Sequence, residues 1–218
     1  MDVRKRFKKF GGEFIPDIIE YLKDYIEKEP TLTISVGCDS VQKRRRTIYA
    51  ITIMLYNTDY RNGAHVVFFR ENLTKVRDNF ERLHKEAQYA LEVGEFLQKE
   101  LEPFYKRKDL TLSEIKRYKF HVEKCNGLHQ HVSQFDEDMF IKHLNVSDVD
   151  KNTQFKLVDL HLDFNPVEGI QDKKGNAKNR SNLSYKTYVP WLRGMGFRVW
   201  AKPLSYAATS AADLLLQD

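Results

Sequence analysis

Apolar side chains recur along this chain in two kinds of pattern, which predict helices and strands in a definite order. The stretch "EFIPDIIEYLKDYIEKEP" carries apolar residues at helical spacing and ends at Pro30, so it predicts a helix. Three β-branched and aromatic runs follow at about 32–40, 47–57 and 64–72, joined by the turn-like segments "QKRRR" and "TDYRNG". Short polar links between such runs favour an antiparallel meander.

The second half of the chain alternates between helices and strands. An apolar stripe from Lys75 to about Glu102 predicts a long helix that ends at Pro103. Later segments predict a strand at 155–166, a helix at 181–194, a strand at 196–203 and a final helix at 205–217. This order indicates an α/β fold with a mixed five-stranded sheet, in which three antiparallel strands precede a β-α-β unit, and with flanking helices.

One part of the chain fits this order poorly. Residues 104–155 contain a short predicted strand, "YKFHVEK", and a polar, His-rich stretch with weak periodicity, so 126–154 is interpreted as an inserted or variable region. The 218 residues are enough for one generous domain. We expect a domain over 31–218, with a variable insertion around 104–155, preceded by an N-terminal helical extension over 1–30.

The composition narrows the class of protein. Apolar residues make up 41% of the chain, with 14 Phe and 11 Tyr, which supports a hydrophobic core and argues against global disorder. No apolar run approaches the roughly 18–20 residues that span a bilayer. The charged N-terminus lacks the apolar stretch of a signal peptide, so a cytoplasmic protein without a membrane partner is expected. The two cysteines, Cys38 and Cys125, do not make a disulfide framework.

Basic residues are clustered, although the net charge is only +5. They form "RKRFKK" at 4–9, "KRRR" at 43–46 and "KKGNAKNR" at 173–180. Solvated loops that aid solubility have this composition, and so do surfaces that contact phosphate, since local concentrations of Lys and Arg bind polyanions. Two of these clusters lie near the acidic motifs described next, which favours phosphate contact.

Four carboxylates occupy suggestive positions: Asp39 late in the first strand, Glu86 in the long helix, Asp163 at the end of the fourth strand and Asp213 in the last helix. Strand-end carboxylates in open α/β sheets converge on the crevice where ligands bind. Gathered carboxylates repel one another and need hard cations to remain ionised. Each acid also has an ordinary explanation, such as a turn cap, a solvated helix position or an ion pair, but the joint pattern favours a metal site that cleaves phosphodiesters.

Asp159, His161 and Asp163 alternate along the fourth strand, so their side chains should point to one face of the sheet. Asp163 is the favoured ligand because it lies nearest the strand end, and Asp159 is the alternative. His161 either holds a ligand carboxylate by a hydrogen bond or packs in the core.

This set of residues resembles the ribonuclease H-like fold and, within it, the YkuK-type family of predicted nucleases. The resemblance rests on "VGCDS" at 36–40, "RLHKEAQYALE" at 82–92, "HLD" at 161–163 and "GMGFRVWAKPLSYAATSAAD" at 194–213, and it spans most of 32–217. It implies a Mg²⁺- or Mn²⁺-dependent nuclease in which Asp39, Glu86, Asp163 and Asp213 are catalytic and hold the metal. The chain departs from the usual "DSQ" of that family by having "DSVQ" at 39–42.

The resemblance also suggests how substrate is held. Lys178 and Arg180 match the basic loop that precedes the penultimate helix in that family. Lys202, at the end of the fifth strand, is either a surface lysine or a point charge that touches a phosphate. The expected partner is therefore a nucleic acid, whether RNA, DNA or a hybrid; the sequence leaves that choice and the oligomeric state open.

Three other interpretations stand beside the nuclease. The chain could bind nucleic acid without cleaving it, or act as a protein-interaction module that recruits a partner through 126–154. Cys125, His129, His131 and His143 suggest zinc, but their C-x3-H-x-H spacing is not a standard structural zinc pattern.

Overall fold

The computed structural model describes residues 3–29, 32–57, 64–104, 156–166, 181–202 and 204–216. Its elements, in chain order, are η1 (Val3–Lys5), β1 (Lys8–Lys9), α1 (Ile18–Lys28), β2 (Thr33–Lys43), β3 (Arg46–Tyr56), β4 (Ala64–Thr74), α2 (Asn79–Leu101), β5 (Val158–Leu162), α5 (Asn182–Gly194), β6 (Arg198–Trp200) and the π-helical segment η2 (Ala207–Ala212).

The strands form one six-stranded sheet in the order β1-β4-β3-β2-β5-β6. Strands β2, β3 and β4 form the predicted antiparallel meander, and β5 and β6 add to β2 in parallel. The predicted mixed sheet is confirmed, and the described residues contain one strand more than the five expected. This extra strand, β1, pairs with Phe68 and Val67 of β4, and its two residues are too few to show an alternating pattern in the sequence.

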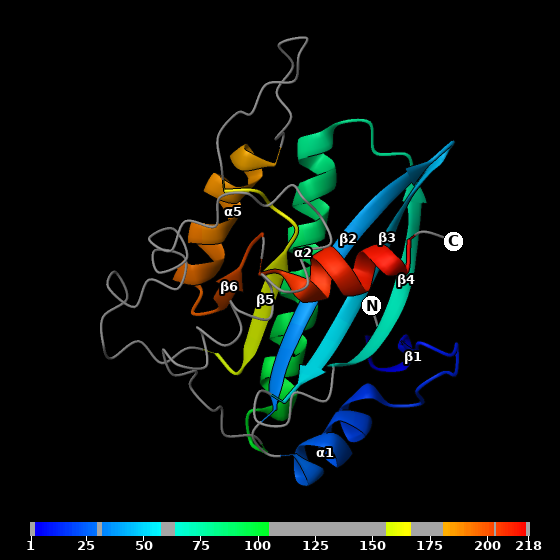
Figure 1. Cartoon of the computed structure of the whole chain (residues 1–218), viewed down its shortest axis with the longest axis vertical. Coiled ribbons are helices and arrows are strands. Elements are labelled where there is room, and N and C mark those ends of the chain that lie inside the picture. The colour runs from blue at the N-terminus through cyan, green and yellow to red at the C-terminus, as the bar shows by residue number, and fades with distance from the viewer. Residues whose placement is uncertain are drawn as a thin grey trace, which may run out of the picture.

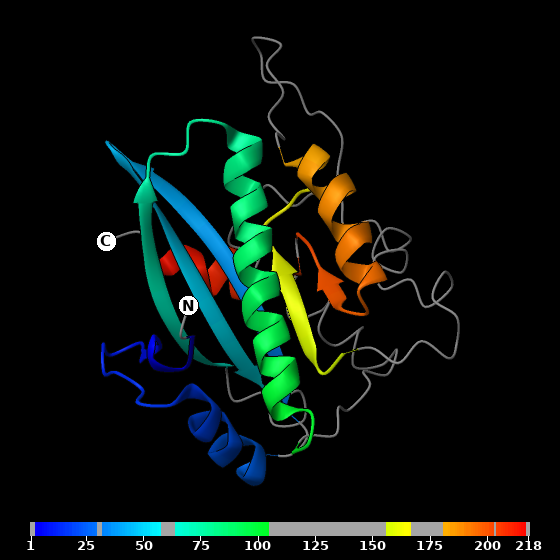
Figure 2. The same ribbon diagram turned by 180° about the vertical axis from the view of Figure 1, so that it is seen from behind.

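The two faces of the sheet are covered differently. Helices α1, α2 and α5 lie on one face, as Figure 2 shows, whereas among the described helices the one that contains η2 crosses the other face, red in Figure 1. The main core lies on the first face and includes Val36, Cys38 and Ile51, all fully buried. Since side chains alternate along a strand, Gly37 and Asp39 point to the η2 face. Strand β2, which has the apolar sequence of a buried strand, therefore carries Asp39 on the face that only the helix of η2 covers among the described helices.

Local capping explains where the long helices begin. The Asp17 side chain accepts from the backbone N–H of Ile19 and Glu20 at the start of α1, and Asp78 accepts from Glu81 N–H at the start of α2. Each cap satisfies backbone N–H groups of the first turn, so each helix begins at the residue after its cap.

Several expectations lie outside the described residues. These are the predicted strand at 118–124, the insertion apart from Phe104, and the zinc candidates Cys125, His129, His131 and His143. The division into an N-terminal extension and a main domain stays a prediction. Within the described part of the chain, none of the helices has the length and apolar character needed to cross a bilayer.

Candidate functional site

The last helix is held against the sheet by a close backbone contact at Gly37. A Cβ atom on Gly37 would lie 2.4 Å from both the carbonyl carbon of Ala207 and the backbone nitrogen of Ala208. The Thr52 hydroxyl donates to the Ala207 carbonyl at 2.7 Å, and Ala207 N–H donates to His161 Nδ1 at 3.1 Å. The start of η2 is thus anchored to β2, β3 and β5 at one residue, which orients everything that follows on the helix.

The four sequence-selected acids share one electrostatic neighbourhood, to which the anchored helix contributes Asp213. Burial raises the pKa of Asp39 to about 7, with added repulsion from Asp163 and then Asp213. Burial also raises the pKa of Glu86 well above its ordinary range, and the negative charge of Asp39 adds to the effect. Carboxylates from β2, α2, the end of β5 and the helix of η2 therefore repel one another across a shared site.

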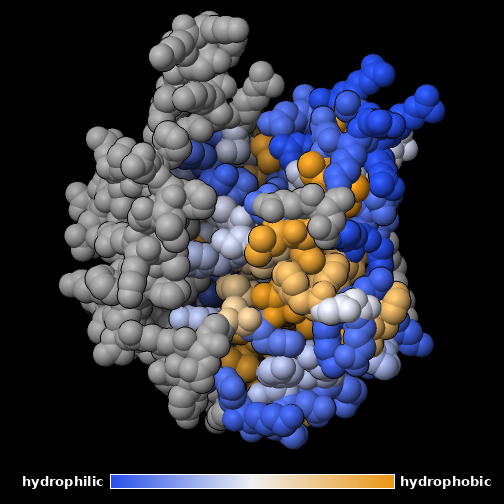
Figure 3. Space-filling model, turned by 45° about the vertical axis from the view of Figure 1, so that its right-hand side comes forward, coloured by the Kyte–Doolittle hydropathy of each residue, from blue (hydrophilic) through white to orange (hydrophobic). Residues whose placement is uncertain are grey.

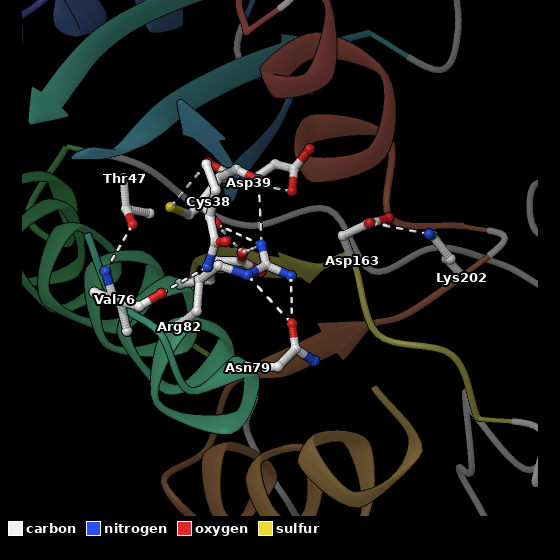
Figure 4. Close-up of polar contacts among 11 residues, drawn as sticks. Cys38, Asp39, Thr47, Val76, Asn79, Arg82, Asp163 and Lys202 are labelled. Carbon is white, nitrogen blue, oxygen red and sulfur yellow. Dashed lines mark hydrogen bonds and ion pairs between the residues drawn. The ribbon is translucent and has the colours of Figure 1, made fainter. Parts of the chain in front are cut away.

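Glu86 belongs to a compact network on the α2 side of this site. Its Oε1 accepts from Ser40 Oγ at 2.6 Å and from an Arg82 guanidinium nitrogen at 2.8 Å. The same Arg82 nitrogen donates to the Ser40 carbonyl, and another donates to Asn79 (Figure 4). Glu86 is only 1% exposed, so the interpretation of it as a solvated helix residue is wrong. Its Oε2 is buried and has no hydrogen-bond partner among the described residues.

Asp163 is held on the opposite side of the site. Its Oδ1 accepts from the Thr209 hydroxyl at 2.8 Å, and its Oδ2 forms an ion pair with Lys202 Nζ at 2.9 Å (Figure 4). The Lys202 side chain is 39% exposed, so it lies at the rim, where it can reach solvent as well as the acid. Lys178 and Arg180, the other predicted substrate-binding residues, lie outside the described residues.

The alternation of Asp159, His161 and Asp163 gives three different roles on one face. Asp159 is buried and accepts from Trp200 Nε1 at 3.0 Å. Burial lowers the pKa of His161 to about 4, so the ring is neutral and its Nδ1 is free to accept from Ala207. Asp163 is the member of the three that raises the pKa of Asp39, which supports its choice over Asp159.

The four carboxylates are chemically suited to bind a hard divalent cation. Among the described residues, however, they do not lie close enough together to coordinate one. The candidates are all carboxylates, the ligand type that Mg²⁺ prefers, and Glu86 Oε2 is buried without a hydrogen-bond partner among the described residues. Within that same part of the chain, no group of three or more His, Cys, Asp or Glu side chains is placed to hold an ion. The raised pKa values and the absence of a ligand cluster agree, because charge repulsion acts over longer distances than metal coordination. In addition, Arg82 forms an ion pair with Glu86 and Lys202 forms one with Asp163.

A comparison with protein families gives the fold its name. The family model described as "Ribonuclease H-like" matches residues 15–216, nearly the whole chain. This chain belongs to the ribonuclease H-like family. The strand order β4-β3-β2-β5-β6 and the last helix on the open face agree with a ribonuclease H-like fold, so the predicted fold class is confirmed. The narrower YkuK-type resemblance stays a prediction. No match was found among curated proteins or among solved structures.

Several residues that build this ribonuclease H-like site were not selected from the sequence. Arg82 and Thr209 hold Glu86 and Asp163, and both lie within motifs that were quoted only for their acids. The sequence could have indicated the role of Gly37, because a glycine inside a strand often marks the close approach of another backbone. The pairing of Arg82 with Glu86 had one too, since residues four apart share a helix face.

We predict that Arg82→Met destabilises the metal-free protein by about 3 kcal/mol, because it leaves the buried Glu86 carboxylate without its cation. The free energy of unfolding in urea at neutral pH measures this. The double variant Arg82→Met/Glu86→Gln removes the orphaned charge and should regain part of the loss. Equal losses in the single and double variants would contradict the assigned role of the ion pair.

Proposed function

We propose that this chain is a metal-dependent nuclease that hydrolyses phosphodiester bonds of RNA or DNA. In this proposal Asp39, Glu86, Asp163 and Asp213 hold Mg²⁺ or Mn²⁺. The observation that carries it is that burial, with added repulsion from Asp163 and Asp213, raises the pKa of Asp39 to about 7, although these residues come from distant parts of the chain. Such an arrangement is unfavourable for folding alone and becomes favourable when a divalent cation is shared.

When bound, the cation would supply positive charge to the phosphodiester and acidify a water molecule. The protein's own residues do the positioning. Arg82 and Ser40 orient Glu86, and Thr209 orients Asp163. Lys202 neutralises Asp163 in the metal-free protein, and its partly exposed ammonium group can turn to a substrate phosphate when a cation takes its place. Lys178 and Arg180 are proposed to bind further phosphates.

A second candidate function is nucleic-acid binding without cleavage, and the two ion pairs at the site favour it. Arg82 and Lys202 already neutralise Glu86 and Asp163. A protein that kept the fold but had lost the chemistry could retain its acids as structural partners in this way. This candidate predicts salt-sensitive binding of nucleic acid with no effect of divalent metal.

Adding and removing the metal tests the proposal directly. Purified protein should cleave labelled single strands, duplexes or RNA–DNA hybrids with Mg²⁺ or Mn²⁺, and excess chelator should abolish this cleavage. The same metals should raise the melting temperature, because a ligand that binds the folded state stabilises it. Cleavage that survives chelation would overturn the metal mechanism. Nucleic-acid binding with no cleavage and no thermal shift would favour the second candidate.

A further inference from the structure

A dense group of cations lies beyond the carboxylate site, at the end of the sheet where β2 turns into β3. We call it the basic tip: Lys43, Arg44, Arg45 and Arg46 of the β2–β3 turn, with Lys75 and Arg77 of the connection from β4 to α2. The two segments are joined, since Lys75 N–H donates to the Arg45 carbonyl at 3.1 Å. Five of these side chains are exposed and Lys43 is half-buried, and none of the six forms an ion pair with another described residue.

The basic tip and Asp39 lie on the same strand, separated on that face by Val41, which packs against an apolar cluster that includes Leu215 and Leu216. Asp39 and Lys43 are four residues apart on β2, so their side chains point to the same face, about 13 Å apart along the strand. Arg46 pairs directly opposite Lys43. In Figure 1 the ends of β2 and β4 project together beyond the helix of η2. Figure 3 shows this side of the molecule as an apolar area with a hydrophilic border that is prominent at the upper right.

The turn itself indicates that its arginines serve something other than folding. Arg44 has a φ of 38°, a left-handed conformation that glycine and asparagine adopt more readily than arginine. It is the only non-glycine residue with positive φ in the described part of the chain. The chain therefore keeps a cation at a position where its backbone conformation is unfavourable.

We propose that the basic tip binds the backbone of a nucleic-acid strand that runs from the carboxylate site along β2. This rests on the proposed function only in taking Asp39 as the reactive end of that path. The distance of about 13 Å corresponds to about four nucleotides of a helical strand that advances about 3.4 Å per nucleotide. The occupant is a polyphosphate backbone because the six cations form no ion pair with described residues, and because Lys43 and its strand partner Arg46 lie on the face that carries Asp39. The bases would point away, so recognition here does not depend on sequence.

The test compares two variants that lose the same charge. Arg44→Asn/Arg46→Gln removes two cations of the basic tip and also relieves the unfavourable turn, so its melting temperature should not fall. Lys28→Gln/Lys99→Gln removes two exposed cations from α1 and the far end of α2. Binding of a fluorescein-labelled oligonucleotide is measured with chelator present, over a range of salt concentrations. For the basic-tip variant the slope of log K against log salt should fall by about 0.7–0.9 per lost phosphate contact, and the control variant should keep the wild-type slope.

The outcome separates this inference from the proposed nuclease activity. Equal slopes and affinities for wild type and both variants would overturn the basic tip as a binding surface, even if metal-dependent cleavage is intact. A loss in the control variant as large as that in the basic-tip variant would overturn it as well, because net charge would then explain the binding. A selective loss supports it whether or not the protein cleaves the oligonucleotide, since binding is measured without metal.

Discussion

Asp39→Asn is expected to reduce metal-dependent cleavage by at least about a thousandfold. The cation contributes several kcal/mol to the transition state, and each 1.4 kcal/mol corresponds to about a tenfold change in rate. Asparagine keeps the shape of Asp39 but removes the charge that, with Asp163 and Asp213, would attract the cation. The measurements are single-turnover cleavage with Mg²⁺ or Mn²⁺ and the thermal shift on adding metal, which the variant should lose. Unaltered cleavage would rule out Asp39 as a metal ligand.

The same substitution should stabilise the metal-free protein at high pH. The unfolded carboxyl ionises near its ordinary value of 3.8, whereas the folded one ionises at about 7. Between these values the folded state binds more protons, so its free energy of unfolding falls as pH rises and stays low above pH 7. A shift of this size corresponds to at most about 4 kcal/mol, and the interaction of Asp39 with the neighbouring acids reduces the share of Asp39 alone.

Urea unfolding in chelator at several pH values should therefore show wild-type stability declining from about pH 4 to 7, with a smaller decline in Asp39→Asn. Asp24→Asn is the matched control, because Asp24 is exposed on α1 and lies on the other face of the sheet. It should keep both the cleavage rate and the wild-type pH profile. Identical profiles for wild type and Asp39→Asn would contradict the raised pKa of Asp39.

Gly37→Ala is expected to destabilise the protein by about 3 kcal/mol, the upper part of the range for overpacked sites. The added Cβ would meet the backbone of Ala207 and Ala208 at 2.4 Å, and backbone cannot rotate away as a flexible side chain can. The helix must then lift from β2, which also strains the hydrogen bonds from Ala207 to His161 and from Thr52 to Ala207. Because that helix carries Thr209 and Asp213, cleavage should fall with stability.

Gly11→Ala is the matched control for this prediction. Nothing lies within 4 Å of a Cβ on Gly11, and its φ is not in the left-handed region. Alanine there should leave stability unchanged or raise it slightly, since it restricts the unfolded chain. The melting temperature and the free energy of unfolding of both variants measure the difference. A Gly37→Ala protein as stable as Gly11→Ala would show that η2 does not need this close contact.

The elements themselves were predictable because their patterns are local. The β-branched runs predicted β2, β3 and β4, and the apolar stripe after Lys75 predicted α2, each within a few residues of its observed bounds. The two-residue strand β1 was missed because pairing with β4, rather than any pattern of its own, makes it a strand. Asp39 and Asp163 could be selected because acids are uncommon in or next to buried strands unless they are paired or bound to metal, and Glu86 because it lies beside the apolar stripe of its helix.

The sequence by itself determined which side of its helix or strand each residue occupies. It therefore determined that Asp39 faces away from Cys38 and that Asp163 shares a face with His161. Only the tertiary structure decided which of these faces meet. The close contact of Gly37 with Ala207 sets the path of the last helix. Lys202 meets Asp163 because β5 and β6, which a helix separates in the chain, lie side by side in the sheet. The two segments of the basic tip meet through the hydrogen bond from Lys75 N–H to the Arg45 carbonyl. The periodicity of the sequence determines the direction of each side chain about the axis of its own helix or strand. Which helices and strands become neighbours depends on how they pack against one another.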